Sequence, residues 1–183
     1  MNALTFRIAT EADASELQQL VESAFRANDS RNGWTDDLGL SSSFRIDVEE
    51  ILAMIIKPDS VMLMATNDLN TLVGSIGTAK RGPNNARLFM LAIDPSQQRS
   101  GIGRQVLAYA EGYCRRTWGV TTLELNALSN RKQLISWYSR HGYRETGKTT
   151  VFPREKFEKL ALPESLCFVE FEKVLGEPDA RAT

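Results

Sequence analysis

Two glycines at the predicted start of a helix, Gly101 and Gly103, form the strongest candidate for a chemical site. They follow an apolar run, Leu91–Ile93, and the dipeptide Asp94-Pro95. Glycine lets backbone N–H groups approach a ligand without a Cβ in the way. The N–H groups of a helix start, together with the helix dipole, bind anions. The segment therefore predicts an anion site, and the alternative is a plain tight turn.

The glycine segment differs from two familiar phosphate motifs. It lacks the Gly-Lys-Ser/Thr ending of a P-loop, and Val106 stands where the dinucleotide fingerprint requires a third glycine. The side chains of Arg99 and Arg104 would add positive charge to the turn. The site is therefore expected to bind a phosphate-rich ligand in some other way.

Composition excludes several classes of protein. The chain has 183 residues, a formal net charge of −1 and 42% hydrophobic residues. This length suits one α/β domain with a single core, and the near-zero charge argues against a nucleic-acid partner. No apolar run or leader suggests a membrane partner or export, so we expect a cytoplasmic protein. Cys114, Cys167 and the single His141 have no zinc-site spacing, so no metal is expected.

The net charge conceals an asymmetry along the chain. Residues 98–154 hold 10 basic and 3 acidic side chains, whereas residues 1–97 hold 8 basic and 13 acidic ones. The basic block includes the glycine segment. It is consistent with a binding site for a compact anion, and the alternative is a solvated basic face.

Apolar periodicity and turn residues predict one domain over residues 1–175 and a flexible tail over 176–183. Residues 28–43 are predicted to form a long loop of the kind that often carries function. The order of elements favours an α/β fold with one mixed sheet and helices on both faces. The predicted strands cover 5–9, 60–65, 71–78, 87–93, 121–126, 143–151 and 166–174, and the helices 12–25, 48–56, 101–118 and 131–140.

Two motifs resemble those of the GCN5-related N-acetyltransferase (GNAT) superfamily. Gln98-Arg99-Ser100-Gly101-Ile102-Gly103 matches its pyrophosphate loop, Gln/Arg-x-x-Gly-x-Gly/Ala. Tyr138-Ser139-Arg140-His141-Gly142-Tyr143 matches its helix ending, Tyr-x-x-x-Gly-Phe/Tyr. The resemblance covers residues 5–174. It implies a single-domain α/β fold with a mixed, mostly antiparallel sheet and helices on both faces, and transfer of an acetyl group from acetyl-CoA to an amine.

The resemblance also implies a set of coenzyme contacts. Backbone groups of Leu91, Ala92 and Ile93 would pair with the pantetheine arm. The family often places an Asn seven residues before its Tyr; that position is Arg131 here, and Asn130 precedes it, so either could contact the pantetheine. The segment expected to hold the pyrophosphate comprises Gln98, Arg99, Ser100, Gly101, Ile102, Gly103 and Arg104.

For catalysis, the resemblance places Tyr138 near the thioester sulfur, where its neutral hydroxyl could protonate the leaving thiolate. The alternative is an aromatic side chain that only packs on the sheet. Many members carry a Glu before the pyrophosphate loop, but that position falls near Arg87, with no carboxylate up to Ile93. The base could be Glu124, which shares a strand face with Asn126, or a water held by backbone carbonyls. Direct attack by a well-placed neutral amine is also sufficient.

The acceptor site is expected under the loop 28–43 and near residues 151–163. Trp34 and Asp36 could bind a cationic amine through a ring face and charge attraction, with Asn126 nearby. Alternatively, Trp34 only anchors the loop and Asp36 caps a turn. We expect a small-molecule amine as partner and a monomer or homodimer. The other readings are acetylation of a peptide or protein amine, and a non-catalytic acyl-CoA sensor.

Overall fold

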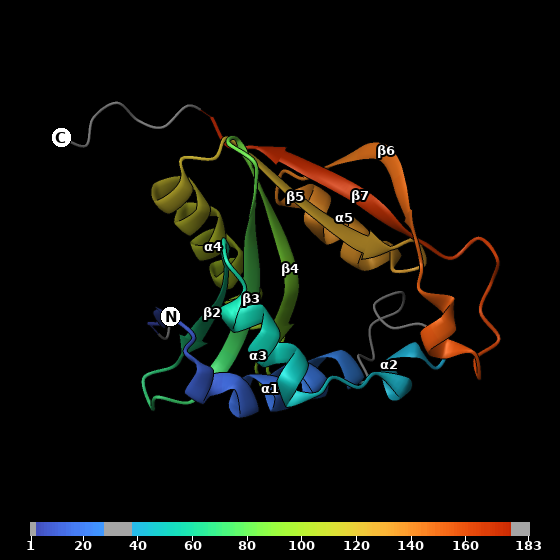
Figure 1. Ribbon diagram of the computed structural model, residues 1–183, viewed down its shortest axis with the longest axis horizontal. Helices are drawn as coiled ribbons and strands as arrows, with labels where there is room; N and C mark the ends of the chain where they lie inside the picture. The colour runs from blue at the N-terminus through green and yellow to red at the C-terminus, as the bar shows by residue number, and fades with distance from the viewer. Residues whose placement is uncertain (1–2, 28–37, 177–183) are drawn as a thin grey trace. The chain divides into compact units, whose positions relative to one another are not determined.

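The computed structural model describes residues 3–27 and 38–176, which form an α/β fold with a seven-stranded, mostly antiparallel sheet (Figure 1). The chain divides into two units. The first comprises Met1–Phe25, Arg45–Leu123 and Val174–Thr183, and the second comprises Arg26–Phe44 and Glu124–Lys173. In sheet order, β1-β2-β3-β4 belongs to the first unit, and β5-β7-β6 belongs to the second except for the first two residues of β5 and the last residue of β7.

The helices and strands follow the order that the sequence predicts, with small differences at their ends and one addition. Residues 40–43, which the sequence assigns to a loop, form the short helix α2. The strands are β1 Thr5–Ile8, β2 Ser60–Thr66, β3 Leu72–Arg81, β4 Asn85–Ile93, β5 Thr122–Leu128, β6 Arg144–Val151 and β7 Cys167–Val174. The α-helices are α1 Ala14–Arg26, α2 Leu40–Ser43, α3 Val48–Ile56, α4 Ile102–Trp118 and α5 Lys132–Arg140. Short 3₁₀ turns cover Glu11–Asp13, Pro95–Gln97 and Arg154–Phe157.

Helices cover both faces of the sheet in the first unit. Almost every residue of β2 and β3 is buried, and consecutive side chains of a strand point to opposite faces, so neither face is open to water there. Helix α4 packs on β3 and β4, and α3 packs on β2 (Figure 1). Apolar side chains are thus buried on both faces of β2 and β3, and α4 packs directly on β3 and β4.

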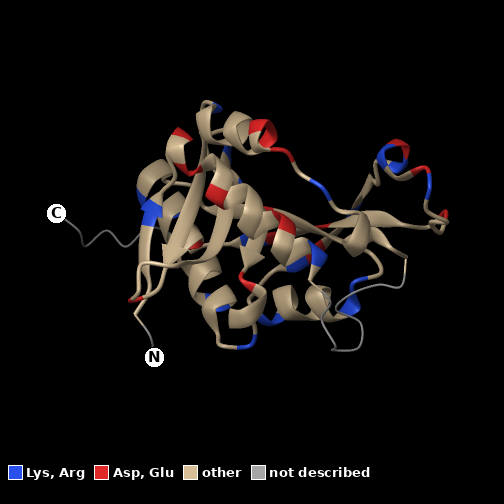
Figure 2. Cartoon of the chain, turned by 90° about the horizontal axis from the view of Figure 1, so that it is seen from below, with Lys and Arg blue, Asp and Glu red and all other residues tan. Residues whose placement is uncertain are grey.

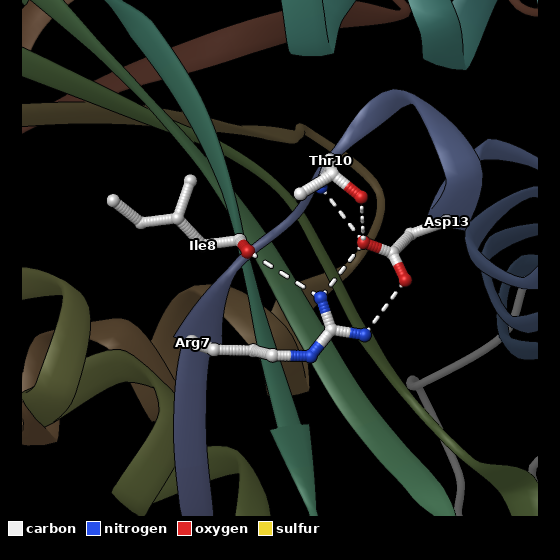
Figure 3. Close-up of polar contacts among 4 residues, drawn as sticks. All are labelled: Arg7, Ile8, Thr10 and Asp13. Atoms are coloured by element: carbon white, nitrogen blue, oxygen red, sulfur yellow. Dashed lines mark hydrogen bonds and ion pairs between the residues drawn. The ribbon is translucent and has the colours of Figure 1, made fainter.

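An ion pair joins the end of β1 to the start of the first helix. The two terminal guanidinium nitrogens of Arg7 donate to the Asp13 carboxylate at 2.7 Å, and the backbone N–H of Thr10 donates to the same carboxylate at 2.7 Å (Figure 3). The Arg7 guanidinium holds the pKa of the Asp13 carboxyl well below its usual range. Thr10 and Asp13 thus form a capping box before the first helix.

A second capping box stands at the start of α3. Glu50 accepts a hydrogen bond from the backbone N–H of Asp47 at 2.9 Å, so the two residues form a capping box at the start of α3. The helix ends at Ile56, directly before Lys57-Pro58, because the residue before a proline disfavours helical backbone angles.

In the second unit, the segment after β6 packs in an apolar cluster. Phe152 is buried there with Leu40 of α2 and Leu166. The Arg154 guanidinium donates to the carbonyl oxygens of Leu162, Pro163, Glu164 and Leu166, which ties this segment into a compact loop. The sequence predicted an acceptor site near residues 28–43 and 151–163, and the structure brings the described ends of these two segments into contact.

Charged side chains of both signs are interspersed over the chain (Figure 2). The basic block 98–154 is divided: four of its ten basic residues belong to the first unit and six to the second. Only the first four can therefore be assigned to the unit that holds the glycine segment.

No helix in the described ranges has the length and apolar character needed to cross a membrane. The predicted one-domain boundary at residue 175 stays a prediction, and the tail from residue 177 lies outside the described residues.

Candidate active site

Strand β4 contains a bulge just before the predicted pantetheine segment. Gly77 of β3 pairs with Phe89, and Ser75 pairs with Ala92, so one residue of β3 lies opposite two residues of β4. Met90 adopts a φ of 53°, in the left-handed region that side-chain-bearing residues rarely enter. A bulge bends its strand and changes where the following groups point. It therefore sets the direction of Leu91–Ile93.

Glycines on β3 make room for this part of β4. A Cβ on Gly77 would collide with the ring of Phe89, and a Cβ on Gly74 would lie 3.0 Å from side-chain atoms of Ile93 and Val106. The close approach of β3 and β4 thus leaves no room for a side chain at Gly77, and at Gly74 a side chain would press on β4 and α4. No local pattern in the sequence indicates the bulge, because it depends on the register between two strands.

The loop after β4 is held by one carboxylate. Asp94 Oδ1 accepts hydrogen bonds from the backbone N–H of Ser96 at 2.8 Å and from its hydroxyl at 2.7 Å. The backbone N–H of Gln97 donates to the Asp94 carbonyl at 2.8 Å, which closes the short turn Pro95–Gln97. These contacts join Asp94 to the residues that directly follow it. They therefore define the path of the loop from β4 to α4.

The start of α4 has the features that bind an anion. Gly101 is its N-cap, with φ 84°, and its carbonyl accepts the first helical bond from Gln105 N–H at 3.3 Å. The N–H groups of Ile102, Gly103 and Arg104 precede that bond, so helix geometry supplies them with no acceptor. A Cβ on Gly101 would meet nothing within 4 Å, so the space beside it is open. Glycine is required there by the backbone angle and not by crowding.

All the residues predicted to hold the pantetheine and pyrophosphate from 91 to 104 lie in the first unit, on β4, the loop and the first turn of α4. Arg99 has φ 68°, so the turn contains two left-handed residues within three positions. The side chains of Arg99 and Arg104 are exposed. Asn130 and Arg131, the other predicted pantetheine contacts, lie in the second unit at the start of α5.

In the second unit, the end of α5 fixes the position of Tyr138. The backbone N–H of Tyr143 donates to the Tyr138 carbonyl at 3.1 Å, and that of Gly142 donates to Ser139 at 3.1 Å. These two bonds, with φ 89° at Gly142, form a Schellman motif. The rings of Tyr138 and Tyr143 meet at 5.8 Å between centroids, as the apolar contact of that motif requires. The four-residue spacing from Tyr138 to Gly142 is thus the spacing that this helix cap requires.

Burial keeps the Tyr138 hydroxyl neutral. The residue is 8% exposed and its ring also contacts Trp137 and Phe171. Desolvation raises the pKa of Tyr138 to about 12, and the positive charge of Arg131 opposes this rise. A neutral phenol near pH 7 can donate a hydrogen bond to developing negative charge.

The predicted polar residues of β5 share one face of that strand. Side chains alternate along β5, with Leu123, Leu125 and Ala127 buried and Glu124 and Asn126 half-buried between them. Asn126 Nδ2 donates to Glu170 Oε1 of β7 at 3.2 Å, which places Glu170 on the same face.

Glu170 has a second contact from strand β6. The hydroxyl of Thr150 donates to the same Oε1 atom at 2.6 Å. Glu170 is not recognisable from the sequence, because one Glu in an alternating strand is indistinguishable from a solvent-facing residue. Trp34 and Asp36, the other predicted acceptor residues, lie outside the described residues.

A comparison of the sequence with protein-family models identifies its relatives. The model of the Acetyltransferase (GNAT) family matches residues 17–143, which is well over half of the chain. The chain belongs to the GNAT acetyltransferase family. The match covers the bulge, the glycine turn and the Tyr138 helix of this GNAT protein. No curated protein matches the sequence closely enough to count as a relative.

Solved structures share the GNAT fold with this chain over nearly its full length. The ribosomal-protein-S18-alanine N-acetyltransferase from Escherichia coli has a TM-score of 0.70 and 15% identity, covering 99% of each chain. The PaiA N-acetyltransferase from Thermoplasma acidophilum, in complex with coenzyme A, has a TM-score of 0.70 and 20% identity, covering 94% of this chain and 99% of that one. The spermidine/spermine N-acetyltransferase SpeG from Vibrio cholerae, in mutant forms, has a TM-score of 0.65 and 14% identity, covering 94% and 95%. At these identities the likeness establishes the fold.

Among the described residues, no group of His, Cys, Asp and Glu is arranged to hold a metal ion.

Proposed function

We propose that this protein is an N-acetyltransferase that moves the acetyl group of acetyl-CoA to a primary amine of a small molecule. The observation that carries the proposal is the order of three structural features along the chain of the first unit. A bulged strand end is followed by a rigid loop and by a glycine-capped helix start whose N–H groups suit phosphate. Family membership supports this assignment.

The residues present are suited to bind the pyrophosphate and the pantetheine arm of the coenzyme. Backbone N–H groups of Ile102, Gly103 and Arg104 would hold the pyrophosphate, and the open space beside Gly101 allows it to approach. Ser100 and Gln98 complete the turn, and Arg99 contributes charge. The backbone of Leu91–Ile93, directed by the bulge, would pair with the pantetheine amides. Either Asn130 or Arg131 would add a further contact.

We further propose direct attack in a ternary complex. The neutral amine nitrogen forms a bond to the thioester carbonyl carbon, the C–S bond breaks, and the amine loses a proton. Glu124, a half-buried carboxylate on β5, is the proposed acceptor of that proton, directly or through water. Proximity of the two substrates supplies much of the acceleration.

The raised pKa of Tyr138 argues against complete transfer of its proton to the leaving thiolate. Its pKa of about 12 lies well above that of a thiol, about 8.5. Complete transfer of its proton to a free thiolate would be uphill by about 5 kcal/mol. We therefore assign Tyr138 a hydrogen bond to the sulfur as charge develops there, and the proton released by the amine finally neutralises the thiolate.

A thiol-release assay tests the proposed function. The protein is incubated with acetyl-CoA and, in turn, benzylamine, tyramine, spermidine, alanine amide and a short peptide with a free N-terminus. Amine-dependent release of CoA with a small amine supports the proposal. Turnover only with the peptide would favour a peptide acetyltransferase, and CoA binding without turnover would favour a sensor. Failure to bind any CoA ester would refute all three.

A further inference from the structure

Met90, in the bulge of β4, has a backbone conformation that glycine would adopt more easily. Its φ is 53°, and in this left-handed region the Cβ crowds a neighbouring carbonyl oxygen, which costs free energy. Asp59 and Asn70 each have φ 57°, but they belong to residue types that tolerate such angles, and they lie at exposed positions outside the strands. Met90 is instead a large apolar residue within a strand.

Packing of the core gives little reason for a side chain at position 90. The adjacent strand has glycine at Gly74 and Gly77, where space is short, whereas position 90, where the backbone favours glycine, has methionine. Met90 is only half-buried, whereas Met62 and Met64 of β2 are fully buried in the core. Strained residues that carry side chains are found mainly at functional sites. The side chain of Met90 is therefore better explained by contact with a ligand.

The proposed course of the coenzyme leads its acyl group to this bulge. The turn that would bind the pyrophosphate follows the C-terminal end of β4, after Asp94. A pantetheine arm paired with Leu91–Ile93 therefore runs from that end toward the start of the strand, and its thioester comes last, beyond Leu91. Met90 is the next residue in that direction, and all these residues belong to the first unit.

We infer that the side chain of Met90 contacts the acyl group of the bound donor and restricts the donor to acetyl-CoA, excluding longer acyl-CoA esters. This inference rests on the proposed function and adds the donor selectivity of the same site. Acetyl and butyryl donors would react alike: the amine nitrogen bonds to the acyl carbonyl carbon, the C–S bond breaks, and the amine proton passes to the thiolate. Selectivity then depends on the space that the methionine side chain occupies.

The decisive variant is Met90→Gly, which removes the side chain and suits the left-handed backbone. With benzylamine as acceptor, kcat/KM of the wild type should be about 100-fold or more higher for acetyl-CoA than for butyryl-CoA, which has two more methylene groups. Met90→Gly should lower this ratio about tenfold or more, mainly by raising kcat/KM for butyryl-CoA. The Kd of coenzyme A, which carries no acyl group, should stay unchanged.

Asn70→Gly is the matched control, because it places glycine at a left-handed residue of the same unit, in the turn between β2 and β3. It should leave the donor ratio unchanged. Met90→Leu keeps an apolar side chain of similar volume and should retain the preference for acetyl-CoA. If Met90→Gly does not fold, Met90→Asn takes its place, since asparagine is shorter than methionine and tolerates left-handed angles. Its donor ratio should also fall.

Three results would overturn the inference while leaving the proposed function intact. They are equal use of both donors by the wild type, an unchanged donor ratio in Met90→Gly, and an equal fall of the ratio in Asn70→Gly. Calorimetric titration gives a readout without turnover: in Met90→Gly the Kd of butyryl-CoA should fall relative to that of acetyl-CoA, and an unchanged ratio of the two Kd values would also overturn the inference. If the wild type binds no CoA ester, the proposed function itself fails.

Discussion

Replacement of Gly101 by Ala measures how much of coenzyme binding depends on the conformation of one residue. Gly101 has φ 84° and nothing within 4 Å of an added Cβ, so the substitution causes no steric clash. Its cost is the left-handed backbone alone, about 1–2 kcal/mol for a residue with a Cβ. If the turn relaxes to avoid this strain, binding must restore the original conformation. The Kd of coenzyme A should then rise about 5- to 30-fold.

The chain offers a closely matched control for this variant. Gly82, in the turn between β3 and β4, has φ 80° and also has nothing within 4 Å of an added Cβ. Gly82→Ala should therefore lower the free energy of unfolding by a similar amount but leave the Kd of coenzyme A unchanged. Calorimetric titration with coenzyme A and thermal unfolding of both variants give the two readouts. Equal Kd values for the two variants would refute the assignment of the turn at Gly101 as the pyrophosphate site.

Three other predictions concern catalysis and stability. Tyr138→Phe should lower kcat about 10- to 100-fold through loss of the hydrogen bond to the leaving sulfur, with the Kd of acetyl-CoA unchanged, whereas Tyr143→Phe should not. A kcat loss in both variants would indicate a packing role. Because the pKa of Tyr138 is about 12, kcat/KM for the amine should rise with pH and show no falling limb below about pH 10; a falling limb near pH 9 that disappears in Tyr138→Phe would contradict the neutral-hydroxyl role. Asp13→Asn should lower the free energy of unfolding at pH 7 by about 1 kcal/mol, measured by urea denaturation. Since the Arg7 guanidinium lowers the folded-state pKa of Asp13, this contribution is present above the ordinary carboxyl pKa of about 4 and is lost as the pH falls toward the lower folded value. A difference between wild type and variant that does not shrink below pH 4 would contradict this origin.

Local patterns in the sequence were sufficient for most of the fold. The capping contacts at Asp13 and Asp47, and the glycine that ends α5, each depend on residues a few positions apart. Such short-range signals are readable without knowing which strands pair. The order of strands and helices follows from the same kind of information, and the predicted α/β fold with a mostly antiparallel sheet is confirmed.

The parts that the sequence could not predict depend on long-range register. Met90 lies in a bulge because β4 has one residue more than β3 between their paired positions, and no local pattern marks that extra residue. The hydrogen bonds that Asn126 and Thr150 donate to Glu170 likewise join residues 44 and 20 positions apart in the chain. The roles predicted for Tyr138 and Glu124 stay predictions, since they concern chemistry with substrates.

The central claim is that this GNAT protein transfers an acetyl group from acetyl-CoA to a small primary amine. Mass spectrometry of reactions with acetyl-CoA and benzylamine tests it most directly, with Gly101→Ala and heat-inactivated protein as comparisons. We expect protein-dependent formation of the N-acetylated amine together with an equal amount of free CoA, and slower formation with Gly101→Ala at low acetyl-CoA. Release of CoA without any acetylated amine, across the whole acceptor panel, would contradict the claim.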